Sequence, residues 1–238
     1  MRTAAVLPVK RFALAKQRLG ASVADPLRLE LARAMVADVL LALAETASIE
    51  LTIVVTREDS VALAARELEA LVLEDVAEEG QSAAAALGVQ CALEQGFARV
   101  LCVPGDCPAL DPLELEALLG DTPARAGARE EPEVVIVPDR HGTGTNGLLL
   151  SPPDAIPPSF GPDSRDRHRA LALAADLPCR VELPPSLLLD IDTGADLAAL
   201  RERLTGDLPA GRHERASRTR AVLDRPERNE AICITTTA

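Results

Sequence analysis

Three aspartates stand where their carboxylates could hold a metal ion together. Asp190 and Asp192 are two residues apart in an apolar segment, 187–192, that we expect to be a strand, so both side chains would lie on the same side. Two carboxylates held this close repel each other unless a cation joins them. Asp106 would end a neighbouring strand, and Mg²⁺ prefers oxygen ligands of this kind. The three aspartates therefore predict a magnesium site, although Asp192 could instead only cap the next helix.

The lysines of the chain are concentrated after the first predicted strand. Of the 25 basic residues, only Lys10 and Lys16 are lysines. A lysine ammonium is a compact, hydrated point charge on a flexible stem, which suits a phosphate oxygen. The pair therefore indicates a phosphate-binding segment, unless the two lysines fell together by chance.

Two glycine-containing segments could bind an anion. The segment 142–147 matches G-x-G-x-x-G, but an apolar run broken by prolines follows it instead of a helix, so we exclude a dinucleotide-binding fold. The segment could form a nest for a phosphate or carboxylate, or be a flexible turn. In 160–169 a glycine turn leads into a helix with Ser164 near its start, where an anion or merely a helix cap is expected. His141 and His168 have no nucleophile at a useful spacing.

Strands and helices are expected to alternate along the chain. The pattern predicts an α/β three-layer sandwich with a mostly parallel sheet. In such sheets ligands bind beyond the carboxyl ends of the strands, where the candidate segments fall. We expect strands at 4–9, 51–56, 70–73, 99–103, 134–137, 148–150, 180–183 and 187–192, and helices at 25–44, 58–68, 81–95, 112–119, 164–175 and 195–204.

The composition excludes several classes of protein. A net charge of −12 argues against a nucleic-acid or anionic-membrane binder, which needs a basic face. No apolar stretch is long enough to span a membrane, and the N-terminus does not resemble a signal peptide. The five cysteines are irregularly spaced and odd in number, which favours reduced thiols in a cytoplasmic protein. Residues 1–204 are expected to form one domain, and the arginine-rich segment 205–238 a largely disordered, dispensable tail.

Taken together, the motifs resemble the CofC/FbiD guanylyltransferases, which make an activated precursor of coenzyme F-420. The resemblance covers about residues 3–204, with the motifs in order. It implies the nucleotide-diphospho-sugar transferase fold, which is GT-A-like and Rossmann-like, and transfer of GMP from GTP to a three-carbon phospho-acid. The matching segments are Pro8–Leu19, Glu79–Ala85, Pro104–Pro108, Arg140–Asn146, Phe160–Ser164 and Leu189–Thr193.

The resemblance also implies roles for particular residues. Lys10, Lys16 and Arg18 would bind the GTP triphosphate, and Gly80 and Gln81 would lie near guanine and ribose. Family members commonly have an aliphatic residue where Gln81 stands. Mg²⁺ would be held by Asp106, Asp190 and Asp192, and the phospho-acid by Thr145, Gly161 and Ser164. Lys10, Lys16 and Asp106 are the residues that we expect to act directly in catalysis.

Several alternatives stay open. Phosphoenolpyruvate is the expected acceptor, because a composition rich in arginine and alanine is typical of a high-GC genome, whereas 2-phospho-L-lactate and 3-phosphoglycerate serve other members of the family. A molybdenum-cofactor or sugar-phosphate nucleotidyltransferase would need a glycine-rich loop after the first strand, and Pro8–Arg11 has no glycine. A non-catalytic phospho-acid-binding regulatory module would be indicated by loss of a metal carboxylate. The resemblance leaves open a homodimer and a downstream transferase as partner.

Overall fold

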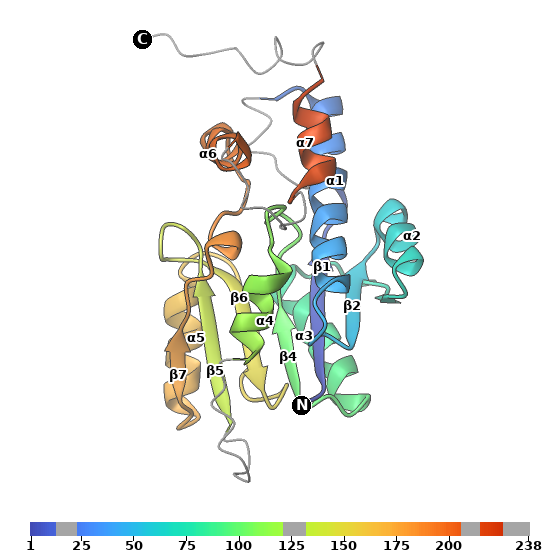
Figure 1. The fold of residues 1–238 in the computed structure, drawn as a ribbon. Coiled ribbons are helices and arrows are strands. Elements are labelled where there is room, and N and C mark those ends of the chain that lie inside the picture. Colours follow the sequence, from blue (N-terminus) through green and yellow to red (C-terminus); the bar gives the residue numbers. More distant parts are fainter. Residues whose placement is uncertain (13–22, 121–131, 206–214, 226–238) are drawn as a thin grey trace.

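We analysed a computed structural model of the chain, which describes residues 1–12, 23–120, 132–205 and 215–225. In these residues one sheet has the strand order β3-β2-β1-β4-β6-β5-β7. Only β6 runs antiparallel to its neighbours, so the sheet is mostly parallel, as predicted (Figure 1). The strands are β1 (Thr3–Val9), β2 (Leu51–Thr56), β3 (Leu71–Leu73), β4 (Arg99–Cys102), β5 (Glu133–Pro138), β6 (Thr145–Ser151) and β7 (Cys179–Val181).

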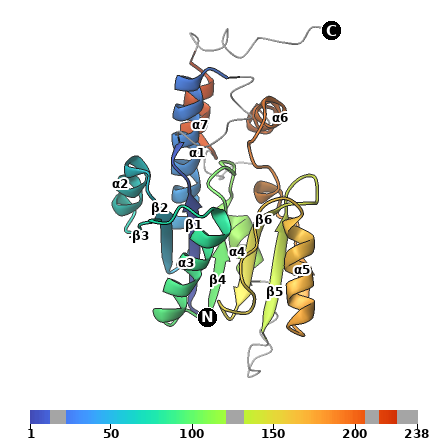
Figure 2. The same ribbon diagram turned by 180° about the vertical axis from the view of Figure 1, so that it is seen from behind.

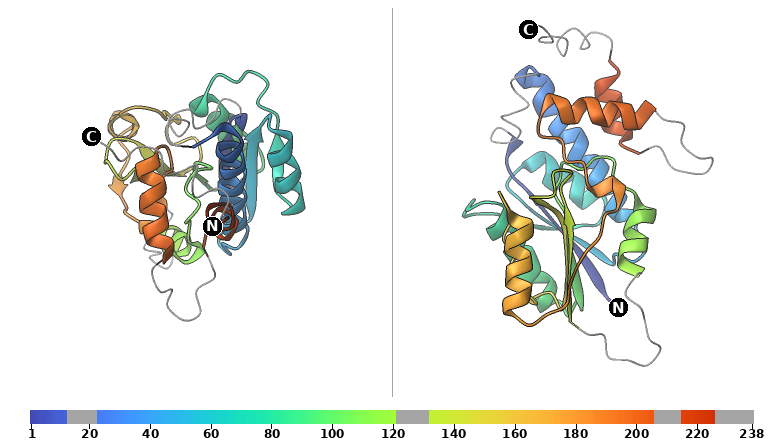
Figure 3. Two further views of the ribbon diagram at one scale, coloured as in Figure 1. Left: turned by 90° about the horizontal axis from the view of Figure 1, so that it is seen from above. Right: turned by 90° about the vertical axis from the view of Figure 1, so that its left-hand side faces the viewer.

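Helices cover both faces of the sheet because its strands are apolar on both sides. In β1, Ala5 and Leu7 belong to one buried cluster, whereas Ala4 and Val6 belong to another. The first cluster lies under α1 (Asp25–Ala44), α2 (Asp59–Glu67) and α4 (Pro112–Gly120), and the second under α3 (Gln81–Glu94) and α5 (Ser164–Ala174). Figures 2 and 3 show these layers from behind and along the edge of the sheet. The three-layer α/β sandwich is therefore confirmed.

The segment 187–192 is not a strand, and this part of the prediction was wrong. A short 3-10 helix, η3 (Pro185–Leu187), is followed by irregular backbone that leads into α6 (Gly194–Thr205). The N–H of Ile191 donates to the carbonyl of Asp106 at 3.0 Å, and the Ile191 side chain is fully buried. This backbone contact, rather than strand alternation, brings the 190–192 segment beside Asp106.

The expected disordered tail contains an ordered helix, α7 (Ser217–Leu223), which packs against α1. The carboxylate of Asp38 on α1 accepts hydrogen bonds from the N–H groups of Arg218 and Thr219, at 3.1 and 2.8 Å, and from the Thr219 hydroxyl at 2.7 Å. Val222 and Leu223 join a third buried cluster with residues of α1 and α6. Sequence analysis missed this helix because its apolar face is only about two turns long.

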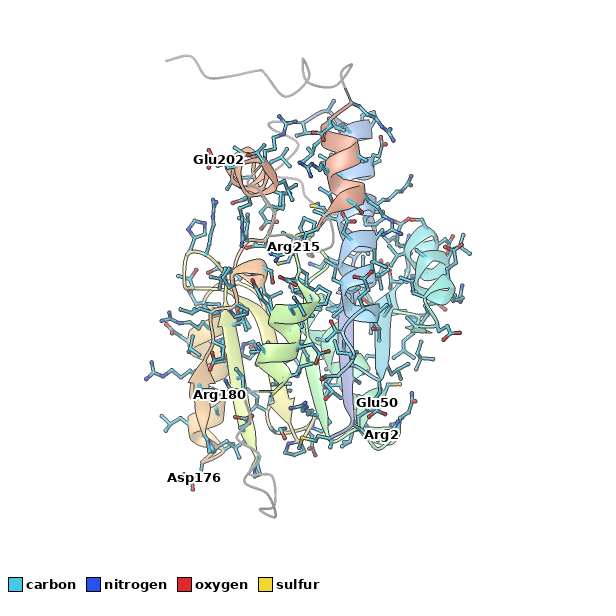
Figure 4. All side chains as sticks on the ribbon, viewed as in Figure 1. Arg2, Glu50, Asp176, Arg180, Glu202 and Arg215 are labelled. Atoms are coloured by element: carbon cyan, nitrogen blue, oxygen red, sulfur yellow. The ribbon has the colours of Figure 1, made fainter. Side chains whose placement is uncertain are left out.

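Ion pairs at the two ends of the sheet differ in their surroundings. Arg2 and Glu50 form an exposed pair of 2.9 Å at the amino ends of the strands (Figure 4). Arg215, just before α7, pairs instead with the buried carboxylate of Asp111 at the start of α4. The latter contact adds to the docking of the C-terminal segment. Among the described residues, no helix is long and apolar enough to cross a membrane.

Candidate active site

A pocket of about 310 Å³ opens at the carboxyl ends of the parallel strands. This is the place where open α/β sheets bind ligands. Segments that are distant in sequence meet there, and they include parts of four of the six predicted ones. The lining consists of Pro8, Val9, Lys10 and Phe12, of Ala32, Met35 and Val36 on α1, of Asp75, Gly80, Gln81 and Ala84, and of Pro104, Gly105, Asp106 and Asp192.

The pocket brings together the predicted nucleotide-binding residues that the structure describes. Lys10 directly follows β1, is exposed, and lines the pocket. Gly80 and Gln81 line it at the start of α3. Gly80 has a φ of +107°, in the region that favours glycine, so the turn that begins α3 depends on this residue. The first turn of α3 leaves its N–H groups without helical acceptors, so they are free to donate to a ligand in the pocket. The other two predicted residues, Lys16 and Arg18, lie outside the described residues.

The three predicted metal ligands are neighbours. Asp106 and Asp192 line the pocket, and Asp190 lies near enough to both for their charges to act on it. Burial raises the pKa of Asp190, and the negative charges of Asp106 and Asp192 raise it further. Burial and like charges destabilise the ionised form of this carboxylate, and a nearby cation would stabilise it. Oxygen donors of this kind fit Mg²⁺. Within the described ranges, however, no three His, Cys, Asp or Glu side chains are arranged closely enough to hold a metal ion. Metal binding stays a prediction.

The capping alternative for Asp192 does not hold. The N–H of Thr193 donates to Oδ2 of Asp196 at 2.7 Å, and the N–H of Asp196 donates to the Thr193 hydroxyl at 3.3 Å. This reciprocal pair has the form of a capping box at the start of α6. Thr193 and Asp196 therefore cap the helix, and Asp192 lines the pocket.

The predicted phospho-acid residues form a second group beside the pocket. Thr145 begins β6, and Ser164 begins α5; both are buried. Gly161 has a φ of +109° and accepts a hydrogen bond at its carbonyl from the N–H of Ser164, at 3.1 Å. A second backbone bond, from Arg165 N–H to the carbonyl of Thr143 at 3.1 Å, holds the glycine loop against the start of α5. The two glycine-containing segments therefore meet.

Two polar contacts connect this group with the pocket. The Asn146 amide donates to Oδ1 of Asp190 at 3.1 Å. On the other side, the N–H of Phe160 donates to the hydroxyl of Ser82 at 2.8 Å, and Ser82 follows the pocket residue Gln81. The phospho-acid group therefore lies between the carboxylates and the start of α3, although its own residues do not line the pocket.

His168 is fully buried and joins both halves of the phospho-acid group. Its Nε2 accepts the N–H of Ser159 at 2.8 Å, and its Nδ1 lies 3.1 Å from the Thr145 hydroxyl oxygen. Burial, and next the charge of Arg167, lower the pKa of His168 to about 4. The imidazole is thus neutral at physiological pH. Because Nε2 accepts, the proton is on Nδ1, which donates to Thr145.

Sequence analysis missed Asp75, Asn146 and the contacts of His168. Asp75 follows β3 at the same end of the sheet as the other candidates, so the strand-end rule could have found it. Asn146 and His168 gave no comparable signal, because their partners are distant in sequence. The four cysteines in the described part of the chain are free, as predicted.

Solved structures identify the fold. A protein from Desulfovibrio desulfuricans G20 that is assigned to the nucleotide-diphospho-sugar transferases has a TM-score of 0.69, with 18% identity over 98% of this chain and 97% of its own. CMP:2-keto-3-deoxy-manno-octonic acid synthetase has a TM-score of 0.58, with 13% identity over 87% and 100%. The fold is therefore that of nucleotidyltransferases of the nucleotide-diphospho-sugar transferase type.

Sequence relatives identify the family to which the chain belongs. The model of the family described as "Guanylyl transferase CofC like" matches residues 3–205. A phosphoenolpyruvate guanylyltransferase from Conexibacter woesei is 48% identical over 94% of this chain and 96% of its own length. One from Sphaerobacter thermophilus is 36% identical over 89% and 96%. The chain belongs to the CofC-like guanylyl transferase family, and the resemblance found in the sequence is confirmed.

Proposed function

We propose that this chain is a cytoplasmic enzyme that transfers GMP from GTP to phosphoenolpyruvate. The products would be enolpyruvoyl-diphospho-guanosine, an activated precursor of coenzyme F-420, and pyrophosphate. The observation that carries the proposal is the convergence of Lys10, the start of α3 and two aspartates on one pocket, with the phospho-acid group beside it. Relatives named phosphoenolpyruvate guanylyltransferase support the choice of acceptor.

The reaction needs positioning and charge neutralisation more than covalent chemistry. A phosphate oxygen of the acid attacks the α-phosphorus of GTP in line. The new P–O bond forms as the bond between the α-phosphorus and the bridging oxygen breaks, and pyrophosphate leaves with that electron pair. Lys10 would bind the phosphates of GTP, and Gly80 and Gln81 at the start of α3 would lie near guanine and ribose. Thr145, Gly161 and Ser164 would orient the acid.

Asp106, Asp190 and Asp192 would hold Mg²⁺, which when bound neutralises the negative charge of the triphosphate. The carboxylate of Asp75 favours guanine over adenine as the base of the nucleotide substrate. A carboxylate accepts the N1–H and N2–H groups of guanine together, whereas adenine has no N1–H. Because Asp75 lines the pocket together with Gly80 and Gln81, it would face the base if those two residues lie near guanine as proposed.

A pyrophosphate-release assay tests the proposal. The full chain would be incubated with Mg²⁺, with GTP or ATP, and with phosphoenolpyruvate, 2-phospho-L-lactate or 3-phosphoglycerate. We expect the highest kcat/KM with GTP and phosphoenolpyruvate. Preference for another of the acids would correct the acceptor, whereas no turnover with any combination would indicate a binding module instead.

A further inference from the structure

The hydroxyl of Thr145 is held by a single imidazole. Among the described residues, His168 is the side chain that hydrogen-bonds this hydroxyl, at 3.1 Å between Oγ1 and Nδ1. Thr145 and His168 come from different elements, β6 and α5, and are 23 residues apart. Both are buried, so the contact is shielded from water and competes with no solvent.

The environment of His168 fixes which nitrogen carries the proton. The backbone N–H of Ser159 can only donate, so Nε2 must be unprotonated to accept it at 2.8 Å. The single proton of a neutral imidazole is then on Nδ1. Thr145 Oγ1 consequently accepts from His168, and the hydroxyl hydrogen of Thr145 must rotate away from the ring.

The surroundings of His168 are rigid. The Phe160 ring packs edge-on against the imidazole, with the centroids 5.3 Å apart. Arg167, the adjacent residue, donates from Nη2 to the carbonyls of Ser159 and Phe160, both at 2.9 Å, and from Nε to the Ser159 hydroxyl at 3.0 Å. The turn before Gly161 is thus tied to α5 by two neighbouring side chains, and only one of them also reaches β6.

We propose that His168 is a positioning residue, which orients the Thr145 hydroxyl as a donor toward the phospho-acid and sets the distance between Thr145 and the Gly161 turn. An anion needs donors, and a hydroxyl that already accepts from an imidazole N–H has its hydrogen available for the anion. The hydrogen bonds polarise one another in the same direction, which strengthens the donor. This inference rests on the proposed function, because it assumes that Thr145 contacts the acid.

Two substitutions of His168 distinguish the contribution of Nδ1 from that of Nε2. His168→Gln can place an amide oxygen near the Nε2 position and keep the bond from Ser159, but it removes the donor to Thr145. His168→Asn can place an amide N–H near the Nδ1 position and keep that donor. We expect His168→Gln to raise KM for phosphoenolpyruvate about 10-fold, the usual scale of a lost hydrogen bond to a charged group. KM for GTP should stay within about 2-fold, and His168→Asn should recover most of the loss.

A double-mutant cycle supplies the decisive readout. Thr145→Val removes the hydroxyl, so adding His168→Gln to it should raise KM for the acid no further. Thermal melts would confirm that each variant folds. An unchanged KM in His168→Gln, additive losses in the cycle, or equal losses for both substrates would overturn the inference. Absence of turnover in the unmodified protein would instead remove the proposed function, and this inference with it.

Discussion

The side-chain amide of Asn146 donates a hydrogen bond of 3.1 Å to Oδ1 of Asp190. The same amide donates to the carbonyl of Leu187 at 3.0 Å, so it fixes the irregular segment that carries the aspartates. Its neighbour Thr145 points instead to His168. Adjacent residues at the start of β6 therefore contact two different groups, the carboxylate of Asp190 and the imidazole of His168. If the proposed sites are correct, the start of β6 would hold the acid close to the metal.

Replacing Asp192 with Asn should lower turnover by roughly 100-fold or more, which is the scale of losing a preorganised electrostatic stabiliser. The substitution removes a charge from the pocket wall and keeps the shape of the side chain. The measurement is kcat with GTP and phosphoenolpyruvate across a Mg²⁺ titration. Asp196→Asn is the matched control: it weakens the capping box of α6, so it should lower the melting temperature more than it changes the Mg²⁺ requirement. Near-normal activity in the Asp192 variant would exclude Asp192 from a metal site.

Lys10→Ala should reduce kcat/KM for GTP by about 10-fold or more, because a charge-assisted hydrogen bond to phosphate is lost. Lys10→Arg should recover only part of this loss, since a planar guanidinium does not replace a compact ammonium on a mobile stem. KM for the acid should stay nearly constant. Arg2→Ala removes the same charge at the opposite end of β1, and is expected to leave kcat/KM unchanged (Figure 4). Full activity of Lys10→Ala would show that this segment does not bind the nucleotide.

Deleting residues 206–238 should lower the melting temperature by about 5 °C or more, because apolar side chains of α1 and α6 that pack against α7 would be exposed to water. Asp38 would lose its three donors, and Val222 and Leu223 would no longer cover α1. Deleting only 226–238 keeps every described contact of α7 and should change the melting temperature little. Equal stability of the two truncated proteins would mean that α7 contributes nothing to the fold.

His168 should make the protein sensitive to acid. Its pKa is about 4 in the folded chain and 6.5 in the reference state, so the unfolded chain binds the extra proton first as the pH falls. Stability of the unmodified protein should therefore decrease between pH 6.5 and 4, relative to His168→Gln, by up to roughly 3 kcal/mol at ~1.4 kcal/mol per pKa unit. Urea denaturation at several pH values measures this. Parallel curves for the two proteins would contradict a buried neutral imidazole.

The architecture, and several of the segments that meet at the pocket, could be predicted from the sequence. Alternating apolar runs and capped helices predict the sandwich, and the strand-end rule predicts that Lys10 and Asp106 converge, whereas residues 139–147, predicted with them, do not line the pocket. These features depend on local sequence patterns, which can be recognised in each segment without knowledge of its tertiary contacts. The antiparallel direction of β6 and its start at Thr145 were not predicted, because a turn of a few residues does not specify the strand partner.

The details that need tertiary contacts could not be predicted. Asp190 and Asp192 approach Asp106 through a backbone bond of Ile191, not through a strand. Helix α7 is stabilised by Asp38, 180 residues away, so its short sequence alone gave no signal. The partners of His168, likewise, are fixed only when β6 and α5 pack together.

Phosphorus NMR of the complete reaction tests the central claim most directly. With GTP, phosphoenolpyruvate and Mg²⁺, GMP transfer predicts loss of the phosphoenolpyruvate resonance and the appearance of two coupled diphosphate signals from one new compound, together with one equivalent of pyrophosphate. The signals should not appear when either substrate or Mg²⁺ is omitted. Release of GDP and inorganic phosphate with phosphoenolpyruvate intact, or no change in any resonance, would contradict the assignment of this chain as a guanylyltransferase acting on phosphoenolpyruvate.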